Sequence, residues 1–177
     1  NPVTIDRLAA YINQLLIEPH HSVSFTGGEP LCQAGALAKL AQMVTGAVYL
    51  ETNGTLPDEL SAVLPYVDII SMDVKLPSTS GREYWSEHIR FLQLAQKRDV
   101  FVKIVLTAET ADDEFARAIE LVAAVNPSIP LILQPVSPVE EVKAISPADV
   151  LKRQSEALQS LKDVRVIPQT HKFLGQM

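Results

Sequence analysis

The 177-residue sequence predicts an α/β protein in which helices cover one parallel sheet. Segments with apolar residues at three- and four-residue spacing alternate along the chain with short runs of β-branched and aromatic residues. Strand–helix–strand units connect through right-handed crossovers, which make neighbouring strands parallel. The apolar runs also end abruptly in polar residues, so we expect ligand-binding side chains to collect at the carboxyl ends of the strands.

Six helices are predicted from the apolar spacing and from capping residues. Thr4 is suited to cap the first helix, and Ser146 followed by Pro147 is typical of the start of the last one. Asp112 and Asp113 would lie near the positive end of the helix that follows Thr110. In chain order, we expect helices over residues 4–17, 34–44, 57–64, 82–98, 111–125 and 146–161.

Six strands are predicted between these helices. The run from Val100 to Leu106 is the clearest, because nearly all of its residues are β-branched or aromatic. The strands are expected over residues 23–26, 48–50, 68–74, 100–106, 131–133 and 164–167. We expect residues 76–81 and 135–143 to be irregular, and residues 1–177 to form a single domain.

The composition limits the class of protein. The chain is 47% hydrophobic and 20% charged, which is typical of a globular domain. A formal charge of -6 and an isoelectric point near 5.2 argue against nucleic acid as the main partner. No apolar run approaches the roughly 20 residues that span a bilayer, so we expect no membrane partner. The single cysteine excludes an internal disulfide framework and, with no visible signal peptide, favours a cytoplasmic location.

The string Thr26-Gly27-Gly28-Glu29-Pro30 follows the first predicted strand. Glycines without Cβ atoms let a ligand approach the backbone closely, and their carbonyls with a carboxylate can accept hydrogen bonds from an amine. A bare glycine pair is more often only a turn, but the longer string is far more specific. It resembles the glycine-glycine-glutamate motif of radical S-adenosylmethionine enzymes, which binds the amino group of the cofactor's methionine at the end of the second strand.

Four further segments extend the resemblance along nearly the whole chain, to the 7-carboxy-7-deazaguanine synthase branch of that superfamily. These segments are residues 51–55, 71–78, 133–136 and 168–172. The resemblance implies a partial, open TIM-type barrel of parallel strands with outer helices, from which the first strand and the cluster loop are missing. It also implies an enzyme of queuosine and 7-deazapurine biosynthesis. That enzyme converts 6-carboxy-5,6,7,8-tetrahydropterin to 7-carboxy-7-deazaguanine and releases ammonia.

The same resemblance implies which residues bind the two small molecules. S-adenosylmethionine would contact Gly27, Gly28, Glu29, Asn53, Asp73, Val74, Lys75, Gln134, Pro135, Val136 and Ser137. The pterin would contact Thr26, Glu51, Gln169 and His171, with the C-terminal tail closing over it.

The resemblance further implies a [4Fe-4S] cluster, Mg²⁺, an electron donor such as flavodoxin, and a homodimer. Three cysteine thiolates, usually spaced Cys-x3-Cys-x2-Cys, hold such a cluster, and this chain contains only Cys32. Because the predicted helix at Thr4 matches the one that follows the cysteine loop, we expect that loop and the magnesium contacts upstream. We therefore expect this chain alone to be inactive and assign no metal ligand and no catalytic residue within it.

Each residue also has a purely structural interpretation. Asp73 and Lys75 would then be a surface ion pair, and Asn53-Gly54 only a turn. Lys103 interrupts an apolar strand, and we favour a solvated position or a charge partner for Asp73 over a catalytic role. The residues expected to be at the surface or structural are His20, His21 and His88. Cys32 is expected to be a small buried hydrophobe without chemistry.

Two other functions remain open from the sequence. One is a glycyl-radical-enzyme activase, which shares the glycine-glycine-glutamate and Asp-x-Lys features. The segment Gln169-Thr170-His171-Lys172 argues against it. The other is a cluster-free domain that binds a nucleoside or a partner protein, which the lack of three cysteines upstream would favour.

Overall fold

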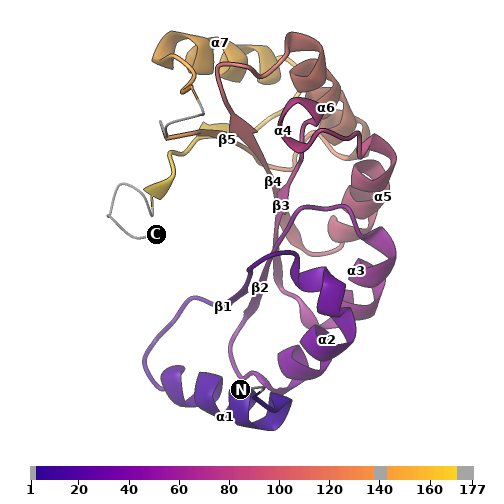
Figure 1. Cartoon of the computed structure of the whole chain (residues 1–177), viewed down its shortest axis with the longest axis vertical. Helices are drawn as coiled ribbons and strands as arrows, with labels where there is room; N and C mark the ends of the chain where they lie inside the picture. Colours follow the sequence, from indigo (N-terminus) through magenta and orange to yellow (C-terminus); the bar gives the residue numbers. More distant parts are fainter. Residues whose placement is uncertain (1–2, 138–142, 171–177) are drawn as a thin grey trace.

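A computed structural model describes residues 3–137 and 143–170 and shows six parallel strands in one sheet (Figure 1). The strands are β1 (Val23–Phe25), β2 (Val48–Thr52), β3 (Ile69–Asp73), β4 (Asp99–Leu106), β5 (Leu131–Pro135) and β6 (Val164–Val166). Their order in the sheet is their order in the chain, and β1 and β6 form its two edges. The helices lie along the outer, convex side, so the described sheet is an open partial barrel, as predicted (Figure 1).

All six predicted helices are present, with shorter ends. The helices are α1 (Ile5–Leu15), α2 (Ala34–Met43), α3 (Pro57–Val63), α5 (Trp85–Ala95), α6 (Asp112–Val125) and α7 (Pro147–Ala157). Both predicted caps form, because the hydroxyls of Thr4 and Ser146 accept hydrogen bonds from the backbone N–H groups of Arg7 and Asp149.

Short helices lie where the sequence predicted none. They are the 3-10 turns η1 (Pro30–Gln33) and η2 (Leu64–Tyr66) and the one-turn helix α4 (Pro77–Ser80). The α4 helix lies in residues 76–81, which were expected to be irregular. Pro77 at the first position favours the α4 turn, and Gly81 ends it in the left-handed region with φ of 69°. The next helix therefore begins at Trp85 and not at Arg82.

The two faces of the sheet differ in chemistry because side chains alternate along each strand. In β4, Val102, Ile104 and Leu106 are fully buried beneath the helices, whereas Phe101 and Lys103 alternate with them on the concave face. Fully buried Phe91 of α5 and Phe115 of α6 complete the core on the convex side. Polar side chains can therefore line the concave face without being buried in the apolar core.

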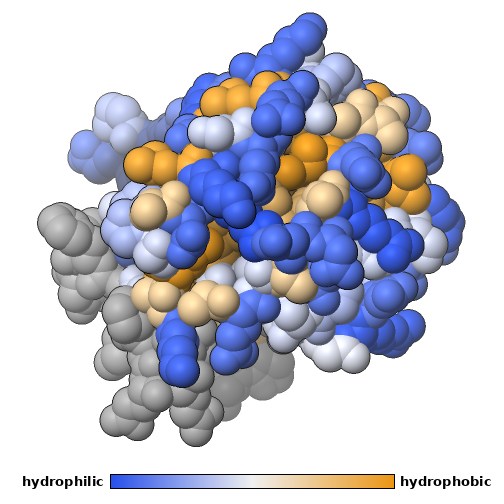
Figure 2. All heavy atoms as spheres, turned by 90° about the horizontal axis from the view of Figure 1, so that it is seen from above, coloured by the Kyte–Doolittle hydropathy of each residue, from blue (hydrophilic) through white to orange (hydrophobic). Residues whose placement is uncertain are grey.

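The outer surface mixes hydrophilic and hydrophobic residues. Figure 2 shows the molecule from above, where hydrophobic groups lie between hydrophilic ones. The large exposed apolar side chains include Leu151 of α7, Leu158 directly after it, and Tyr11 of α1. Within the described ranges, no helix combines the length and the apolar character required to cross a bilayer.

Candidate functional site

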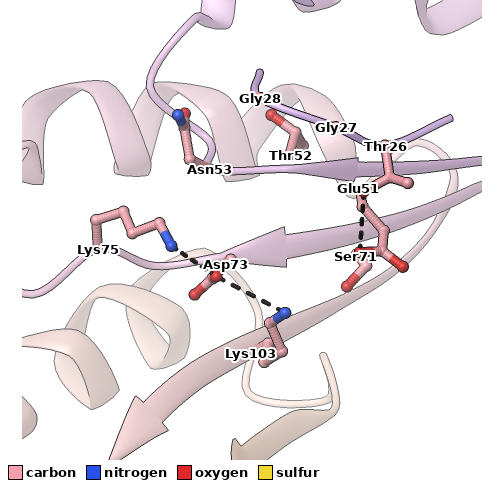
Figure 3. Close-up of a pocket in the computed structure, with 10 residues that line it drawn as sticks. All are labelled: Thr26, Gly27, Gly28, Glu51, Thr52, Asn53, Ser71, Asp73, Lys75 and Lys103. Atoms are coloured by element: carbon pink, nitrogen blue, oxygen red, sulfur yellow. Dashed lines mark hydrogen bonds and ion pairs between the residues drawn. The ribbon is translucent and has the colours of Figure 1, made fainter. Parts of the chain in front are cut away.

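A pocket of about 180 Å³ opens on the concave face at the carboxyl ends of the first three strands (Figure 3). It lies where β1, β2 and β3 end, with one side chain from the middle of β4. Its lining residues are Thr26, Gly27, Gly28, Glu51, Thr52, Asn53, Ser71, Asp73, Lys75 and Lys103. The polar strand ends that the sequence singled out on β1, β2 and β3 therefore meet in one place.

Asp73 lies between two lysines in this pocket. Its Oδ2 accepts a hydrogen bond from Lys75 Nζ at 2.8 Å and lies 3.7 Å from Lys103 Nζ (Figure 3). Lys103 is the register partner of Asp73 on β4 and is 22% exposed, so its predicted role as a charge partner for Asp73 is confirmed. Because the Asp73 side chain is only 17% exposed, the pair is not a freely solvated surface ion pair.

The second carboxylate oxygen of Asp73 is buried and accepts no hydrogen bond from the described residues. A buried acceptor without a donor is costly, so this atom is suited to a hydroxyl or ammonium group of a ligand. The ribose hydroxyls and the methionine ammonium of S-adenosylmethionine are donors of this kind. The residues present therefore fit that cofactor.

The glycine pair leaves the backbone accessible. Gly27 has a φ of 128°, in the region that favours glycine, and a Cβ at either Gly27 or Gly28 would meet no atom within 4 Å. Open space beside an unshielded backbone is suited to close approach by a ligand.

Glu29 does not line the pocket, and its carboxylate binds the protein itself. Oε1 accepts hydrogen bonds from Thr52 Oγ1 at 2.8 Å and from Leu31 N at 3.1 Å, and Oε2 accepts one from Asn53 N at 2.8 Å. The side chain thus ties the glycine motif to the end of β2 and caps η1. Direct contact between Glu29 and the cofactor stays a prediction.

Asn53 is both part of a turn and part of the pocket. Its Oδ1 accepts hydrogen bonds from Thr55 N and Thr55 Oγ1, at 3.0 and 2.6 Å. Gly54 follows with φ of 67°, and a Cβ there would lie 2.6 Å from Cε of Met72. The two interpretations of Asn53-Gly54 are therefore compatible, since the turn is real and Asn53 also faces the pocket.

Thr26 and Glu51, expected on the pterin side, lie together. Thr26 Oγ1 is 3.4 Å from Glu51 Oε2, at the β1 side of the pocket. Ser71, Thr52 and Lys103 also line it, although the sequence had not indicated them as ligand contacts. Period-two alternation was the missed signal, because Ser71 lies two positions before Asp73 on one strand.

The remaining predicted contacts lie farther along the same rim. Gln134 and Pro135 end β5, Val136 and Ser137 follow it, and none of the four lines the pocket. Ser137 N donates to Gln169 Oε1 at 2.9 Å, so the two predicted segments meet each other. His171 lies outside the described residues.

Val74 is a separate case, because its side chain is buried. Its backbone N–H donates to Lys103 O at 2.9 Å, so only the backbone carbonyl is left for a ligand.

The three described histidines agree with their expected surface or structural roles, whereas the cysteine does not agree with its expected burial. His20 and His21 are exposed, whereas His88 of α5 is fully buried and its Nε2 lies 3.1 Å from the carbonyl oxygen of Asn53. Cys32 was expected to be buried, which is wrong: η1 buries Leu31 and leaves Cys32 exposed.

Burial of His88 predicts a dependence of stability on pH. Loss of hydration lowers the pKa of His88 from 6.5 to about 4, although the bond to Asn53 acts in the opposite direction. The unfolded chain then binds a proton below pH 6.5 while the folded protein stays neutral down to about pH 4. We expect the free energy of unfolding to fall by about 3 kcal/mol over that interval, relative to His88→Gln. Urea denaturation of both proteins at several pH values measures this difference. If the free energies of unfolding of the two proteins change with pH in the same way, the prediction is contradicted.

Comparisons with known proteins show the family of the chain. No protein-family model matches the chain. It is 45% identical over 183 residues to the 7-carboxy-7-deazaguanine synthase of Geobacter sulfurreducens, covering 100% of this chain and 73% of that protein. The chain belongs to the 7-carboxy-7-deazaguanine synthase family. The family's protein from Archaeoglobus fulgidus is 34% identical over 184 residues, covering 99% of this chain and 74% of the relative.

Solved structures support the fold. A radical SAM methyltransferase from Sphaerobacter thermophilus has a TM-score of 0.66 at 14% identity, covering 93% of this chain and 56% of that one. A domain of pyruvate-formate lyase-activating enzyme from Bacteroides vulgatus has a TM-score of 0.62 at 15% identity, covering 84% and 99%. At these identities the likeness shows the fold alone. The glycyl-radical activase alternative therefore gains no support beyond a shared scaffold.

Membership of the 7-carboxy-7-deazaguanine synthase family implies S-adenosylmethionine and a [4Fe-4S] cluster. The pocket fits the first, but this chain does not fit the second, because it contains one cysteine and a cluster needs three thiolates. Among the residues that the structure describes, no three His, Cys, Asp or Glu side chains are grouped to hold a metal ion.

Proposed function

We propose that this chain forms the binding rim of a radical S-adenosylmethionine lyase of queuosine and 7-deazapurine biosynthesis. The reaction converts 6-carboxy-5,6,7,8-tetrahydropterin to 7-carboxy-7-deazaguanine and releases ammonia. The observation that carries the proposal is the single pocket that joins the glycine motif to Asp73, in a chain of the synthase family.

The cofactor would lie along the ends of β1 to β3. The open backbone at Gly27 and Gly28 would accept from its ammonium group, and the free oxygen of Asp73 from a second donor. Lys75 is a compact positive charge suited to the methionine carboxylate. Asn53 and the backbone of Val74 would complete the S-adenosylmethionine site at these strand ends, and residues 134–137 would extend that site to the end of β5.

The pterin would lie on the β1 side of the pocket. The carboxylate of Glu51 is a natural acceptor for adjacent N–H groups on a pterin edge, and Thr26 can donate or accept beside it. Gln169 and His171 would contribute from the C-terminal segment.

When bound, the cluster and S-adenosylmethionine supply the radical chemistry that removes a hydrogen atom from the substrate. The chain's own residues position the two small molecules and exclude water. We propose that residues outside the printed sequence supply the cluster thiolates and the Mg²⁺ site. A flavodoxin-type electron donor, a cytoplasmic location and a homodimer belong to the same proposal.

The test uses the protein expressed from its complete gene, reconstituted anaerobically with iron and sulfide and supplied with a reductant, S-adenosylmethionine and the carboxylated pterin. We expect mass spectrometry to detect 7-carboxy-7-deazaguanine. An intact cluster and cofactor cleavage without ring-contracted product would overturn the substrate assignment. Residues 1–177 alone serve as the control, and we expect them to cleave no cofactor.

A further inference from the structure

Asn53 presents one unengaged side-chain group at the rim of the pocket. Its Oδ1 is held by Thr55, and its backbone N–H donates to Glu29. In the described part of the chain, no acceptor takes a hydrogen bond from Asn53 Nδ2, and Asn53 is one of the residues that line the pocket (Figure 3). An amide NH₂ in that position is suited to a carboxylate or hydroxyl oxygen of a ligand.

The position of this side chain depends on the turn that starts with the peptide unit between Asn53 and Gly54, because that turn places the Thr55 groups that hold Oδ1. Glycine tolerates both orientations of such a peptide at little cost, because Gly54 adopts a positive φ of 67° without strain. Both polar atoms of the unit are nevertheless fixed. The N–H of Gly54 donates to Thr52 Oγ1 at 3.2 Å, and Thr52 Oγ1 in turn donates to Glu29.

His88 holds the carbonyl oxygen of the same peptide unit. Its Nε2 lies 3.1 Å from the Asn53 carbonyl oxygen, and because a carbonyl only accepts, Nε2 must carry the hydrogen. The ring is fully buried against Trp85 and Tyr84, and its Nδ1 has no hydrogen-bond partner among the described residues. Burying a polar ring costs free energy unless the ring forms a hydrogen bond. Within the described residues, the bond from Nε2 to the Asn53 carbonyl is the one that offsets this cost.

We propose that His88 is a positioning residue for the ligand. Its donation to the Asn53 carbonyl selects one orientation of the 53–54 peptide, and this fixes the turn in which Thr55 holds the Asn53 side chain at the wall of the pocket. The inference rests on the proposed binding of S-adenosylmethionine, although His88 touches no ligand itself. It acts from α5, 35 residues away from the turn that it holds.

The experiment measures S-adenosylmethionine affinity by equilibrium dialysis, in the reconstituted protein from the complete gene. His88→Phe keeps a ring but removes the donor, and we expect the Kd to rise about tenfold, the loss of roughly one hydrogen bond. His88→Gln places an amide donor near the position of Nε2, and we expect its Kd within about threefold of the native value. Leu92→Ala, fully buried on the same helix, is the control: we expect lower stability and an unchanged Kd.

Hydrogen exchange gives a second reading that global stability does not determine. In His88→Phe, the amides of Gly54 and Thr55 should exchange faster, while core amides of β4 keep their protection relative to the Leu92→Ala control. If His88→Phe does not fold, His88→Asn replaces it, because its amide is one bond too short to reach the carbonyl.

The outcomes separate this inference from the proposed function. Native affinity in His88→Phe, or an equal loss of affinity in Leu92→Ala, overturns the positioning role and leaves the proposed function standing. Failure of the native protein to bind S-adenosylmethionine overturns both.

Discussion

Asp73→Asn should raise the Kd of S-adenosylmethionine about 100-fold, which is the effect expected for losing a hydrogen bond to a charged group in a partly buried site. The substitution keeps the shape of the side chain but removes the negative charge between Lys75 and Lys103. Lys75 and Lys103 then lie close together without the carboxylate that they share. The side-chain oxygen that would accept from the ligand also becomes a weaker acceptor, because it no longer carries negative charge. Equilibrium dialysis with the reconstituted protein measures the change, and a melting curve checks that the variant is folded.

A matched control is available in the Asp58–Arg90 pair. Asp58 accepts from Arg90 at 2.7 Å but its side chain is 81% exposed and lies outside the pocket. Since exposed ion pairs contribute little, Asp58→Asn should leave both the Kd and the stability nearly unchanged. Native affinity in Asp73→Asn would show that this carboxylate does not face the cofactor.

Glu29→Ala should lower the free energy of unfolding by about 4 kcal/mol, because three donors lose a charged acceptor at once. Glu29→Gln should cost less, since the amide keeps one oxygen but places its NH₂ group against one of those donors. Urea denaturation measures both variants. Glu18→Ala, an exposed carboxylate elsewhere on the surface, should change stability by less than about 0.5 kcal/mol.

The same variants decide between two roles for Glu29. If the carboxylate only joins the glycine motif to the end of β2, loss of affinity for S-adenosylmethionine should accompany loss of stability. A large loss of affinity at native stability would instead indicate that Glu29 binds the cofactor directly. Native stability with native affinity would contradict both roles.

The fold was predictable because its determinants are local. Alternating burial in β4 and the capping residues Thr4 and Ser146 are encoded within a few positions, and each of the six predicted helices and six predicted strands is present with its ends shifted by at most a few residues. Pro77 and Gly81 carried a signal for the one-turn helix α4 that the polar residues between them concealed.

The site was predictable only in part. The positions of Gly28, Asp73 and Lys75 follow from the rule that parallel strands end at one rim. The bonds from Glu29 to the end of β2 and from His88 to Asn53 join residues 23 to 35 positions apart, which no local period encodes. The exposure of Cys32 likewise depends on how η1 packs against its neighbours.

The order of the strands has a consequence for how the protein is made. In the described sheet, each strand from β2 to β6 pairs with the strand synthesised just before it, so each can pair as soon as it is made. All the residues that line the pocket fall between Thr26 and Lys103, well before the last two strands leave the ribosome. The growing chain can therefore assemble this pocket during translation, and β5 and β6 are added afterwards with the further contacts proposed at residues 134–137 and Gln169.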